Sequence, residues 1–272
     1  MLHGIKIGGL VIENPVALAP MAGVGDSPFR NLVAGYGEPE FRPSFLVSEM
    51  VSSKAQTILL DMKKPRNARV ERMMRAVSAA GSRPQKGFPL TSVQIFGSDP
   101  AVMARSARLN EELGAAMIDI NMGCPVGKII KSGSGSDLLK DPALAERIVE
   151  AVARAVKIPV GVKMRTGWDD KGRDAAGFAR MLESSGASMI AVHGRTRSQF
   201  YSGPVDFDSI AAVKRAVKVP VIGNGDITSP QLAREMMEKT GCDGVMIGRG
   251  ACGAPWILSH VVRYLKTGVL AP

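Results

Sequence analysis

The sequence predicts a (β/α)8 barrel, an α/β fold in which eight parallel strands alternate with outer helices. Eight short apolar runs, rich in Val and Ile, recur along the chain, and segments with helical spacing of Ala, Leu, Glu, Lys and Arg lie between most of them. Polar or glycine-rich residues follow nearly every run. A doubly wound open sheet is the alternative, but no Gly-x-Gly-x-x-Gly follows the first run, which favours the closed barrel.

The eight apolar runs are expected to be buried parallel strands, because they are apolar on both faces. In chain order they are Val16–Ala19, Phe45–Val47, Ser92–Ile95, Met117–Ile120, Val160–Val162, Met189–Val192, Val221–Ile222 and Val245–Ile247.

Helices are expected between the strands, and some of their starts are marked. Asp141-Pro142 and Ser229-Pro230 each place an N-cap residue before a proline at the first helical position. The expected helices include Pro142–Val156, Ala175–Ser184, Phe207–Val217 and Pro230–Lys239.

The length of 272 residues suits one barrel, for which about 250 residues are usual. We expect the barrel over residues 1–255 and a short C-terminal remnant over 256–272. The apolar fraction of 45% argues against disorder. Lys6, Glu13 and Pro15 interrupt any apolar signal segment, and no run approaches the length of a membrane span. Three cysteines at unrelated spacings form neither a disulfide framework nor a metal site. We expect a cytoplasmic monomer without membrane or metal.

The net charge of +10 suggests a polyanionic partner such as nucleic acid, although charge that serves only solubility would look the same. Residues 61–90 concentrate this charge, with eight basic side chains against two acidic ones. Val70, Met73, Met74 and Val77 have helical spacing and predict an amphipathic helix there. Its basic face either meets RNA or is simply solvated.

Polar residues at the ends of the predicted strands would meet at one mouth of a barrel, where such folds carry their active sites. Each has a packing explanation by itself, because Cys124 could be a buried hydrophobe, Lys163 could pair with a core carboxylate and His193 could be structural. Their convergence instead predicts a site. The strand ends are Pro20-Met21-Ala22-Gly23, Gln94, Asn121-Met122-Gly123-Cys124-Pro125, Lys163-Met164-Arg165, His193-Gly194-Arg195, Asn224-Gly225-Asp226 and Gly248-Arg249-Gly250.

The last two strand ends predict a phosphate site, because glycines allow close approach of backbone N–H groups and Arg249 can fork onto phosphate oxygens. The phosphate of flavin mononucleotide (FMN) would fit, with Lys163 and Gln94 beside its ring. Cys124 lacks a predicted base, and a thiol with a pKa of about 8.5 suits a proton donor better than a nucleophile. Residues 128–137 are expected to form a flexible glycine-rich lid, or else a phosphate cradle.

The motifs together closely resemble those of the bacterial tRNA-dihydrouridine synthases, in particular the B-type branch. They run from residue 19 to about residue 257. The matches are Ala19-Pro20-Met21-Ala22-Gly23, Ser48-Glu49-Met50, Val93-Gln94-Ile95-Phe96-Gly97, Asp119-Ile120-Asn121-Met122-Gly123-Cys124-Pro125, Lys163-Met164-Arg165-Thr166-Gly167-Trp168, His193-Gly194-Arg195-Thr196-Arg197, Gly223-Asn224-Gly225-Asp226-Ile227 and Gly248-Arg249-Gly250.

This resemblance implies that NADPH is the electron donor and a tRNA uracil, flipped out of the RNA fold, is the substrate. The uracil would receive hydride at C6 from FMN and a proton at C5 from Cys124. Asn121 and Arg165 would contact the uracil. Basic residues would position the RNA backbone, namely Lys128, Lys131, Arg195 and Arg197. The residues that would hold FMN are Pro20, Met21, Ala22, Gln94, Lys163, His193, Asn224, Gly225, Asp226, Gly248 and Arg249.

Family members usually carry a helical RNA-binding domain after the barrel, and with about twenty residues after Arg249 we expect that domain to be absent here. Two other functions stay open. An FMN barrel enzyme for a free pyrimidine, such as a dihydroorotate or dihydropyrimidine dehydrogenase, would share the flavin residues. A non-catalytic RNA-binding protein could retain the barrel. The Asn-Met-Gly-Cys-Pro loop and the basic charge favour the tRNA enzyme.

Overall fold

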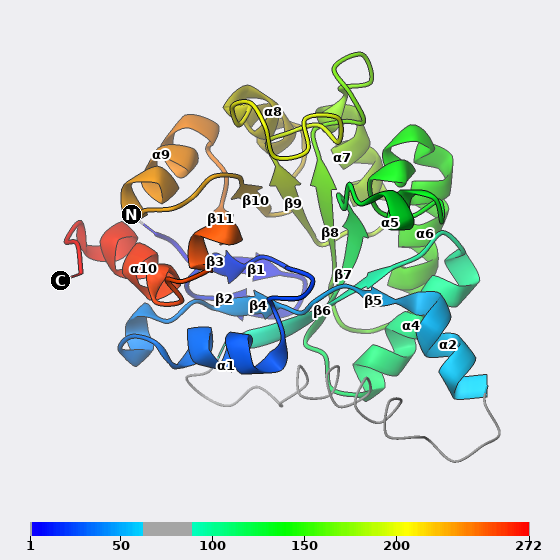
Figure 1. Ribbon diagram of the computed structural model, residues 1–272, viewed down its shortest axis with the longest axis horizontal. Helices are drawn as coiled ribbons and strands as arrows, with labels where there is room; N and C mark the ends of the chain where they lie inside the picture. Colours follow the sequence, from blue (N-terminus) through cyan, green and yellow to red (C-terminus); the bar gives the residue numbers. More distant parts are fainter. Residues whose placement is uncertain (1, 62–88, 272) are drawn as a thin grey trace.

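A computed structural model describes residues 2–61 and 89–271, and in these ranges the chain folds as a closed parallel barrel surrounded by helices (Figure 1). Strand β4 pairs with both β3 and β6, and β3 pairs with β11, which closes the ring. The predicted (β/α)8 barrel is confirmed. Its strands are β3 (Val16–Leu18), β4 (Phe45–Val47), β6 (Leu90–Phe96), β7 (Met117–Met122), β8 (Val160–Arg165), β9 (Met189–His193), β10 (Val221–Asn224) and β11 (Gly244–Ile247).

Each predicted apolar run coincides with one of these strands, but several strands reach further than the runs. Strand β7 continues through Asn121, and β8 continues through Lys163 to Arg165. The side chains of successive strand residues point to opposite faces. Asn121, Lys163 and Arg165, which were expected at strand ends, therefore lie inside the ladder, where alternate side chains point into the barrel.

Three short strands were not expected from the sequence. β5 (Val51–Ser52) extends the sheet beside β6, and β1 (Ile5–Ile7) and β2 (Leu10–Ile12) form an antiparallel hairpin. Ile7 and Ile12 are buried among the inward-facing apolar side chains of the barrel. Gly8, in the left-handed region at φ +56°, lies so close to Pro159 that a Cβ would be 2.9 Å from its ring. The hairpin thus closes the end of the barrel opposite the carboxyl ends of the strands.

The helices begin where the sequence places capping residues. The Asp141 carboxylate accepts from the Leu144 N–H at 2.9 Å, and the Ser229 hydroxyl accepts from the Leu232 N–H at 3.2 Å, as predicted. The helices are α1 (Ser27–Gly35), α2 (Ser53–Asp61), α4 (Pro100–Glu112), α5 (Gly127–Ile130), α6 (Pro142–Ala155), α7 (Ala175–Ser184), α8 (Phe207–Ala216), α9 (Pro230–Thr240) and α10 (Ile257–Thr267), with 3-10 turns η1 (Pro39–Phe41), η2 (Gly135–Lys140) and η3 (Arg249–Ala251).

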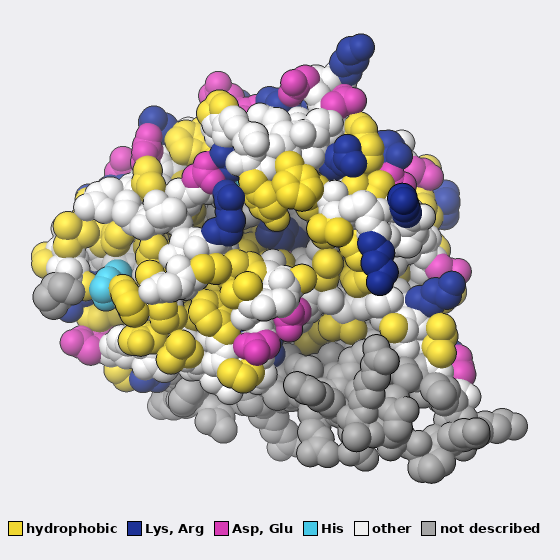
Figure 2. Space-filling view, viewed as in Figure 1, with side chains coloured by type: hydrophobic (Ala, Val, Ile, Leu, Met, Phe, Trp, Pro, Cys, Tyr) yellow, Lys and Arg dark blue, Asp and Glu magenta, His cyan; other side chains and the backbone are white. Residues whose placement is uncertain are grey.

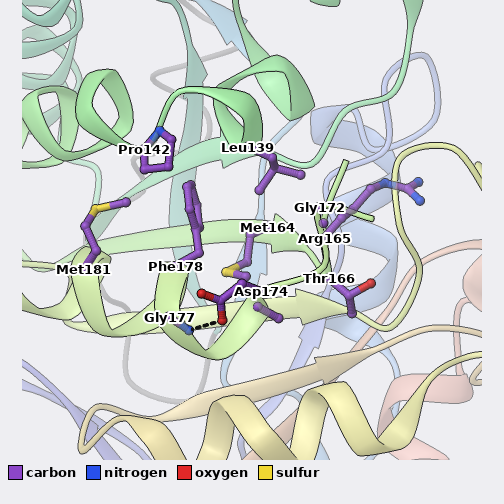
Figure 3. A pocket seen from close by; sticks show the side chains of 12 residues that line it. Leu139, Pro142, Met164, Arg165, Thr166, Gly172, Asp174, Gly177, Phe178 and Met181 are labelled. Atoms are coloured by element: carbon purple, nitrogen blue, oxygen red, sulfur yellow. Dashed lines mark hydrogen bonds between the residues drawn. The ribbon is translucent and has the colours of Figure 1, made fainter. Parts of the chain in front are cut away.

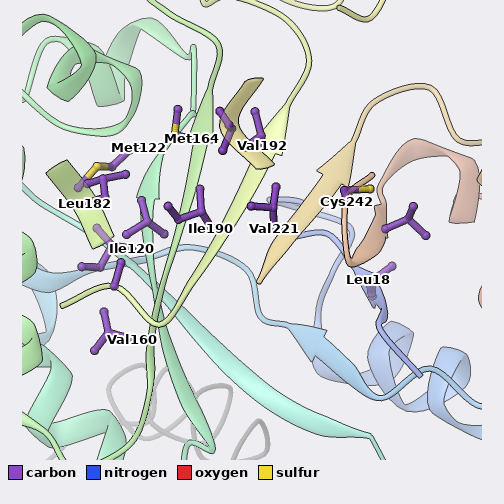
Figure 4. Packing of buried hydrophobic residues seen from close by; sticks show 14 of the residues in the cluster. Leu18, Ile120, Met122, Val160, Met164, Leu182, Ile190, Val192, Val221 and Cys242 are labelled. Atoms are coloured by element: carbon purple, nitrogen blue, oxygen red, sulfur yellow. The ribbon is translucent and has the colours of Figure 1, made fainter. Parts of the chain in front are cut away.

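Apolar side chains form two layers, one on each side of the strands. The outer layer lies between strands and helices and includes Ile120, Met164 and Val192 (Figure 4). The inner layer fills the lower barrel and includes Met117 and Met189. In β7 the even-numbered residues belong to the outer layer, so Asp119 and Asn121 face the barrel interior together with Met117.

The segment after β11 lies against the barrel. Helix α10 buries Ile257, Val261 and Leu265 and contacts β3, α9 and η1. Helix α10 therefore packs against the barrel, and the predicted division into a barrel over residues 1–255 and a short remnant over residues 256–272 stays a prediction.

Most of the basic segment 61–90, including the amphipathic helix expected around Val70–Val77, lies outside the described residues. In the part of the chain that the structure describes, no helix is both long and apolar enough to cross a membrane.

Candidate active site

A cavity of about 680 Å³ opens at the carboxyl ends of the strands. Figure 2 shows a hollow near the middle of one face, with Lys or Arg side chains deep inside it and hydrophobic side chains along its edge. The structure brings together in this cavity the residues that were predicted for cofactor, uracil and proton transfer. They are Pro20, Met21, Ala22, Gln94, Asn121, Cys124, Lys163, Arg165, His193, Asn224, Gly225, Asp226, Gly248 and Arg249.

The Cys124 thiol is half-buried on the wall of this cavity. Burial raises its pKa above the ordinary value, and this effect outweighs the neighbouring Arg165 and Lys163, which favour the thiolate. The Cys124 backbone is held from two sides: its N–H donates to Asn121 Oδ1 at 2.9 Å, and its carbonyl accepts from the Ser136 N–H at 3.1 Å and hydroxyl at 2.9 Å. A protonated thiol on a fixed backbone suits a proton donor.

Lys163 is the cation of the cavity floor. Its Nζ donates to Asn224 Oδ1 at 3.0 Å, and Asn224 Nδ2 in turn donates to the Met246 carbonyl at 2.8 Å. Burial, reinforced by Arg165, lowers the pKa of Lys163 to about 8, while Asp119 opposes the shift. The ammonium therefore remains mostly charged at pH 7, and its position is fixed by an amide rather than by a carboxylate in direct contact.

His193 is a neutral member of the cavity wall. Burial lowers its pKa to about 2, and Lys163, Arg165 and Arg195 act in the same direction. A neutral imidazole carries one donor and one acceptor nitrogen. His193 can therefore hydrogen-bond a bound group without adding a further positive charge to the site.

Asp119 was part of a recognised motif but was not singled out as a site residue. Its carboxylate is completely buried below the cavity and accepts from Gln94 Nε2 at 2.6 Å. Gln94 Oε1 accepts from Asn121 Nδ2 at 2.7 Å. Burial raises the pKa of Asp119 to about 6, against the effects of Gln94 and Lys163. The period-two pattern of β7 could have indicated it, because a carboxylate there must face the interior.

Two aromatic residues at the cavity mouth were also missed. Phe200 and Tyr201 are exposed, their rings pack edge to face at 4.8 Å, and Tyr201 lines the cavity. The guanidinium of Arg249 lies 4.6 Å from the Tyr201 ring centroid. The adjacent aromatic pair shortly after a predicted strand end was the available signal for these residues.

Residues 128–137 do not form the flexible lid that was expected. They fold as the end of α5, a turn and the start of η2, with Ser134 and Ser136 buried against the barrel. The hydrogen bonds from Ser136 to the Cys124 carbonyl tie this segment to the site. Its glycines serve this turn: a Cβ on Gly135, at φ +64°, would lie 2.9 Å from the Cys124 carbonyl oxygen.

The burial of Arg195 differs from what its predicted role requires. The side chain was expected to position an RNA backbone, but it is only 3% exposed and forms an ion pair with Asp226. Its Nε also donates to the carbonyls of Ser202 at 3.2 Å and Gly203 at 3.0 Å. All its donor groups face the protein, so Arg195 supports the loop beside the cavity. Arg249, which is 59% exposed, also pairs with Asp226, with its NH2 group 3.1 Å from Oδ1.

The other predicted RNA contacts lie outside the cavity lining. Lys128 and Lys131 are exposed on α5 and the following turn. Arg197 is half-buried, with its Cζ 4.4 Å from the ring centroid of Trp168, and Lys140 Nζ lies 4.3 Å from the same ring. These side chains together provide positive charge on the surface around the site.

A second cavity, of about 370 Å³, lies between β8, η2 and α7 (Figure 3). Its walls include Leu139, Met164, Phe178 and Met181, and Arg165 turns its guanidinium away from it. Few polar groups converge there, in contrast to the larger cavity, which we take as the candidate active site.

The position of Arg195 leads to a specific expectation for Arg195→Met. Losing the buried partner of Asp226 should lower the free energy of unfolding by about 2 kcal/mol, discounted because the carboxylate is 46% exposed. The salt dependence of the predicted RNA binding should not change, since Arg195 does not reach the surface. Urea unfolding and binding titrations at several salt concentrations measure the two quantities. Arg197→Met is the contrasting variant, because Arg197 is a predicted RNA contact and its loss should reduce the salt dependence. A reduced salt dependence in Arg195→Met would contradict the supporting role.

Comparison with known proteins gives consistent matches over the chain. The family model described as "Dihydrouridine synthase (Dus)" matches residues 17–272. A probable tRNA-dihydrouridine synthase of Rickettsia conorii is 47% identical over 266 residues, covering 97% of this chain and 74% of that protein. The tRNA-dihydrouridine synthase B of Pseudomonas aeruginosa is 44% identical over 268 residues, covering 98% of this chain and 75% of that protein.

Among solved structures, the 6-hydroxypseudooxynicotine amine oxidase of Pseudomonas geniculata N1 superposes with a TM-score of 0.68 at 12% identity. The match covers 97% of this chain and 49% of that protein. At this identity the similarity concerns the fold alone.

Proposed function

Because the chain belongs to the dihydrouridine synthase family, we propose that it reduces the C5=C6 bond of a uridine in tRNA to 5,6-dihydrouridine, with bound FMN and with NADPH as electron donor. The observation that carries the proposal is the pairing of a protonated, backbone-fixed thiol with a cationic cavity floor in one cavity. The thiol suits proton donation, and the cationic floor suits the electron-rich ring of reduced FMN.

The residues of the cavity fit FMN. Gly225, at φ +139°, has no room for a Cβ, which would lie 2.8 Å from Val205. Gly248 also lines the cavity and, having no side chain, leaves its backbone accessible there. Their backbones and Arg249 form a phosphate end. The one carboxylate there, Asp226, is already neutralised by two arginines. Lys163, Gln94, His193 and Asn224 would face the ring, together with Pro20, Met21 and Ala22.

When bound, FMN would supply the hydride that reaches C6 of the uracil. The chain's own residues would do the rest. Cys124 donates a proton to C5, and the resulting thiolate is stabilised by Arg165 and Lys163, the two cations whose charges act on it. Arg165 and Asn121 present N–H donors at the cavity wall, where the uracil carbonyls need partners.

The tRNA would lie across the basic surface around the mouth. Lys128 and Lys131 are exposed and can contact phosphates. Arg197 and Lys140 both lie against the Trp168 ring and add positive charge beside an aromatic side chain. The uracil must leave its stack to enter a cavity at the barrel mouth. The cavity contains residues for the base, and the surrounding surface contains residues for the backbone.

The deciding experiment separates a tRNA enzyme from a free-pyrimidine enzyme. The protein loaded with FMN is reduced with NADPH under anaerobic conditions and mixed with unmodified tRNA, with free uridine or with uracil. We expect flavin reoxidation and dihydrouridine in the RNA only with tRNA. Equal or faster reoxidation with a free pyrimidine would replace the proposal by the alternative enzyme, and protein that takes up no FMN would favour a non-catalytic RNA-binding role.

Removal of the exposed lysines should weaken tRNA binding without affecting flavin chemistry. In Lys128→Ala/Lys131→Ala, the slope of log K against log salt should become less steep by roughly one to two units, since each phosphate contact contributes about 0.9. NADPH-driven flavin reduction should be unchanged, because neither side chain lines the cavity. Filter binding at several salt concentrations provides the slope, and Lys157→Ala/Lys171→Ala is the control. An unchanged slope would remove α5 from the RNA surface.

A further inference from the structure

We propose that Asp119 is a positioning residue of this site, a buried carboxylate that sets the orientation of two side-chain amides and through them holds the backbone of Cys124. The inference rests on the proposed function, because it gives Asp119 its importance through the proton donor. Asp119 does not line the cavity and does not contact the thiol. Asp119 can therefore affect the position of Cys124 only through intervening hydrogen bonds.

Five residues form one continuous chain of hydrogen bonds. The N–H groups of Cys124 and Gly123 donate to Asn121 Oδ1 at 2.9 and 3.2 Å. Asn121 Nδ2 donates to Gln94 Oε1 at 2.7 Å, and Gln94 Nε2 donates to Asp119 Oδ2 at 2.6 Å. Every bond points the same way, from the loop at the mouth down to the carboxylate. This series of hydrogen bonds is called the amide relay below.

The carboxylate determines this direction. An ionised carboxylate can only accept, so Gln94 must turn its NH2 group toward Asp119 and its carbonyl toward Asn121. Asn121 must then turn its NH2 group toward Gln94, which leaves its carbonyl facing the N–H groups of Gly123 and Cys124. If Asn121 were turned around, its NH2 group would meet these two donors and the loop would have to move.

The placement of Asp119 is otherwise unfavourable. Its side chain is completely buried, and Oδ1 has no hydrogen-bond partner in the described structure. Besides Gln94, its surroundings are largely apolar, because Met117 and Met189 belong to the same inner layer and a Cβ on Gly161 would lie 3.3 Å from Oδ1. The charge of Lys163 favours the carboxylate without outweighing the burial. An apolar side chain would suit such surroundings better. The raised pKa of Asp119 has the same cause. The contact with Gln94 is what an apolar residue could not provide.

A packing role and a positioning role of Asp119 predict opposite orders of activity for two substitutions. Asp119→Leu fits the apolar layer but removes the acceptor from the relay. Asp119→Asn keeps a carbonyl that Gln94 can use, although its NH2 group also permits the reversed order. If Asp119 acts only in packing, activity should follow stability. If it positions the amides, the rate should fall more in Asp119→Leu than in Asp119→Asn, even where the Leu variant is the more stable.

The experiment uses the full chain with bound FMN. We measure the rate of tRNA-dependent reoxidation after reduction by NADPH, the rate of NADPH-driven reduction, thermal unfolding, and the side-chain ¹⁵N–¹H signals of Asn121 and Gln94. Ser92→Ala is the matched control, because Ser92 is equally buried on the neighbouring strand and donates to the Met117 carbonyl at 3.3 Å, outside the relay.

In Asp119→Leu we expect tRNA-dependent reoxidation to fall on the order of tenfold to a hundredfold, with a smaller loss in Asp119→Asn. The Asn121 side-chain signals should shift in the Leu variant, and Ser92→Ala should match wild type. Unshifted Asn121 signals, or a rate in the Leu variant at or above that in the Asn variant, would overturn the proposal.

If Asp119→Leu does not fold, Asp119→Asn decides alone: it must show a second or shifted set of Asn121 and Gln94 signals, and wild-type signals with a wild-type rate would overturn the relay. If wild-type protein is not reoxidised by tRNA, the proposed function fails, while the amide signals still test the relay itself. The two failures are therefore distinguishable.

Discussion

Cys124→Ala should abolish most of the tRNA-dependent half of the reaction while leaving NADPH-driven flavin reduction intact. Proton donation by a positioned acid contributes about 10²–10⁴-fold, so we expect a loss of that size in tRNA-dependent reoxidation. The thiol lies on the cavity wall, its backbone is fixed by Asn121 and Ser136, and burial keeps it protonated. Single-turnover reoxidation with unmodified tRNA measures the step directly.

Cys252→Ala is the matched control for this variant. Cys252 lines the same cavity but is exposed, and its sulfur lies 3.9 Å from that of Met21 rather than in the Cys124 loop. We expect its reoxidation rate to match wild type. If Cys124→Ala reoxidised as fast as Cys252→Ala, the proton would have to come from another group and the role of Cys124 would be lost.

The pH dependence of the same step follows from the direction of the pKa shift. A general acid is active when protonated, and the raised pKa keeps the Cys124 thiol protonated beyond its ordinary range. The rate of reoxidation should therefore stay level through neutral pH and fall above about pH 8, where Lys163 loses its charge before the thiol ionises. A rate that rises through this range would indicate a thiolate nucleophile instead.

The sequence was sufficient for the barrel because the relevant signals are local. Each strand is visible in the sequence as a short apolar run, and helix starts such as Asp141-Pro142 contain an N-cap residue. The position of the cavity at the carboxyl ends of the strands followed from the barrel fold alone. The β1–β2 hairpin was not predicted, because Lys6 interrupts the apolar residues of β1 and the buried residues of both strands meet only the distant lower barrel.

Many of the cavity residues were also predictable, but Tyr201 and the partners of individual side chains were not. Arg195 and Arg249 follow similar strand ends, yet one is buried against Asp226 and the other is exposed. That difference depends on the 194–206 loop, whose carbonyls take up the Arg195 donors. Likewise, the glycines of residues 128–137 suggested freedom, whereas contacts with Cys124 fix them in a turn.

Arg165 joins more of the site than any single motif indicated. Its Nε donates to the Gly123 carbonyl at 2.8 Å, and its NH1 donates to the carbonyls of Thr196 at 2.8 Å and Phe200 at 2.7 Å. The side chain thus links the Cys124 loop to the loop of the two aromatic residues. It remains charged, because burial lowers its pKa only to about 10.

Arg165→Met should therefore damage both stability and catalysis. Each buried carbonyl left without a donor costs on the order of 1–3 kcal/mol, and because water can reach Phe200 we expect a total loss of about 3 kcal/mol. Reoxidation by tRNA should fall roughly a hundredfold, because both the uracil contact and the position of the Cys124 loop are lost. Urea unfolding and single-turnover reoxidation measure the two effects.

Arg173→Met separates this role from a general effect of removing an arginine near β8. Arg173 pairs with the partly buried Asp206 at 2.6 Å and with the exposed Asp170 at 2.5 Å, and it does not line the larger cavity. Such pairs contribute about 1 kcal/mol or less, so the control should lose little stability and no activity. Arg165→Lys is the more demanding test, because an ammonium keeps the charge but cannot span three carbonyls with a planar fork. Wild-type reoxidation in Arg165→Lys would mean that charge alone serves the uracil, and that the link between the two loops does not contribute to catalysis.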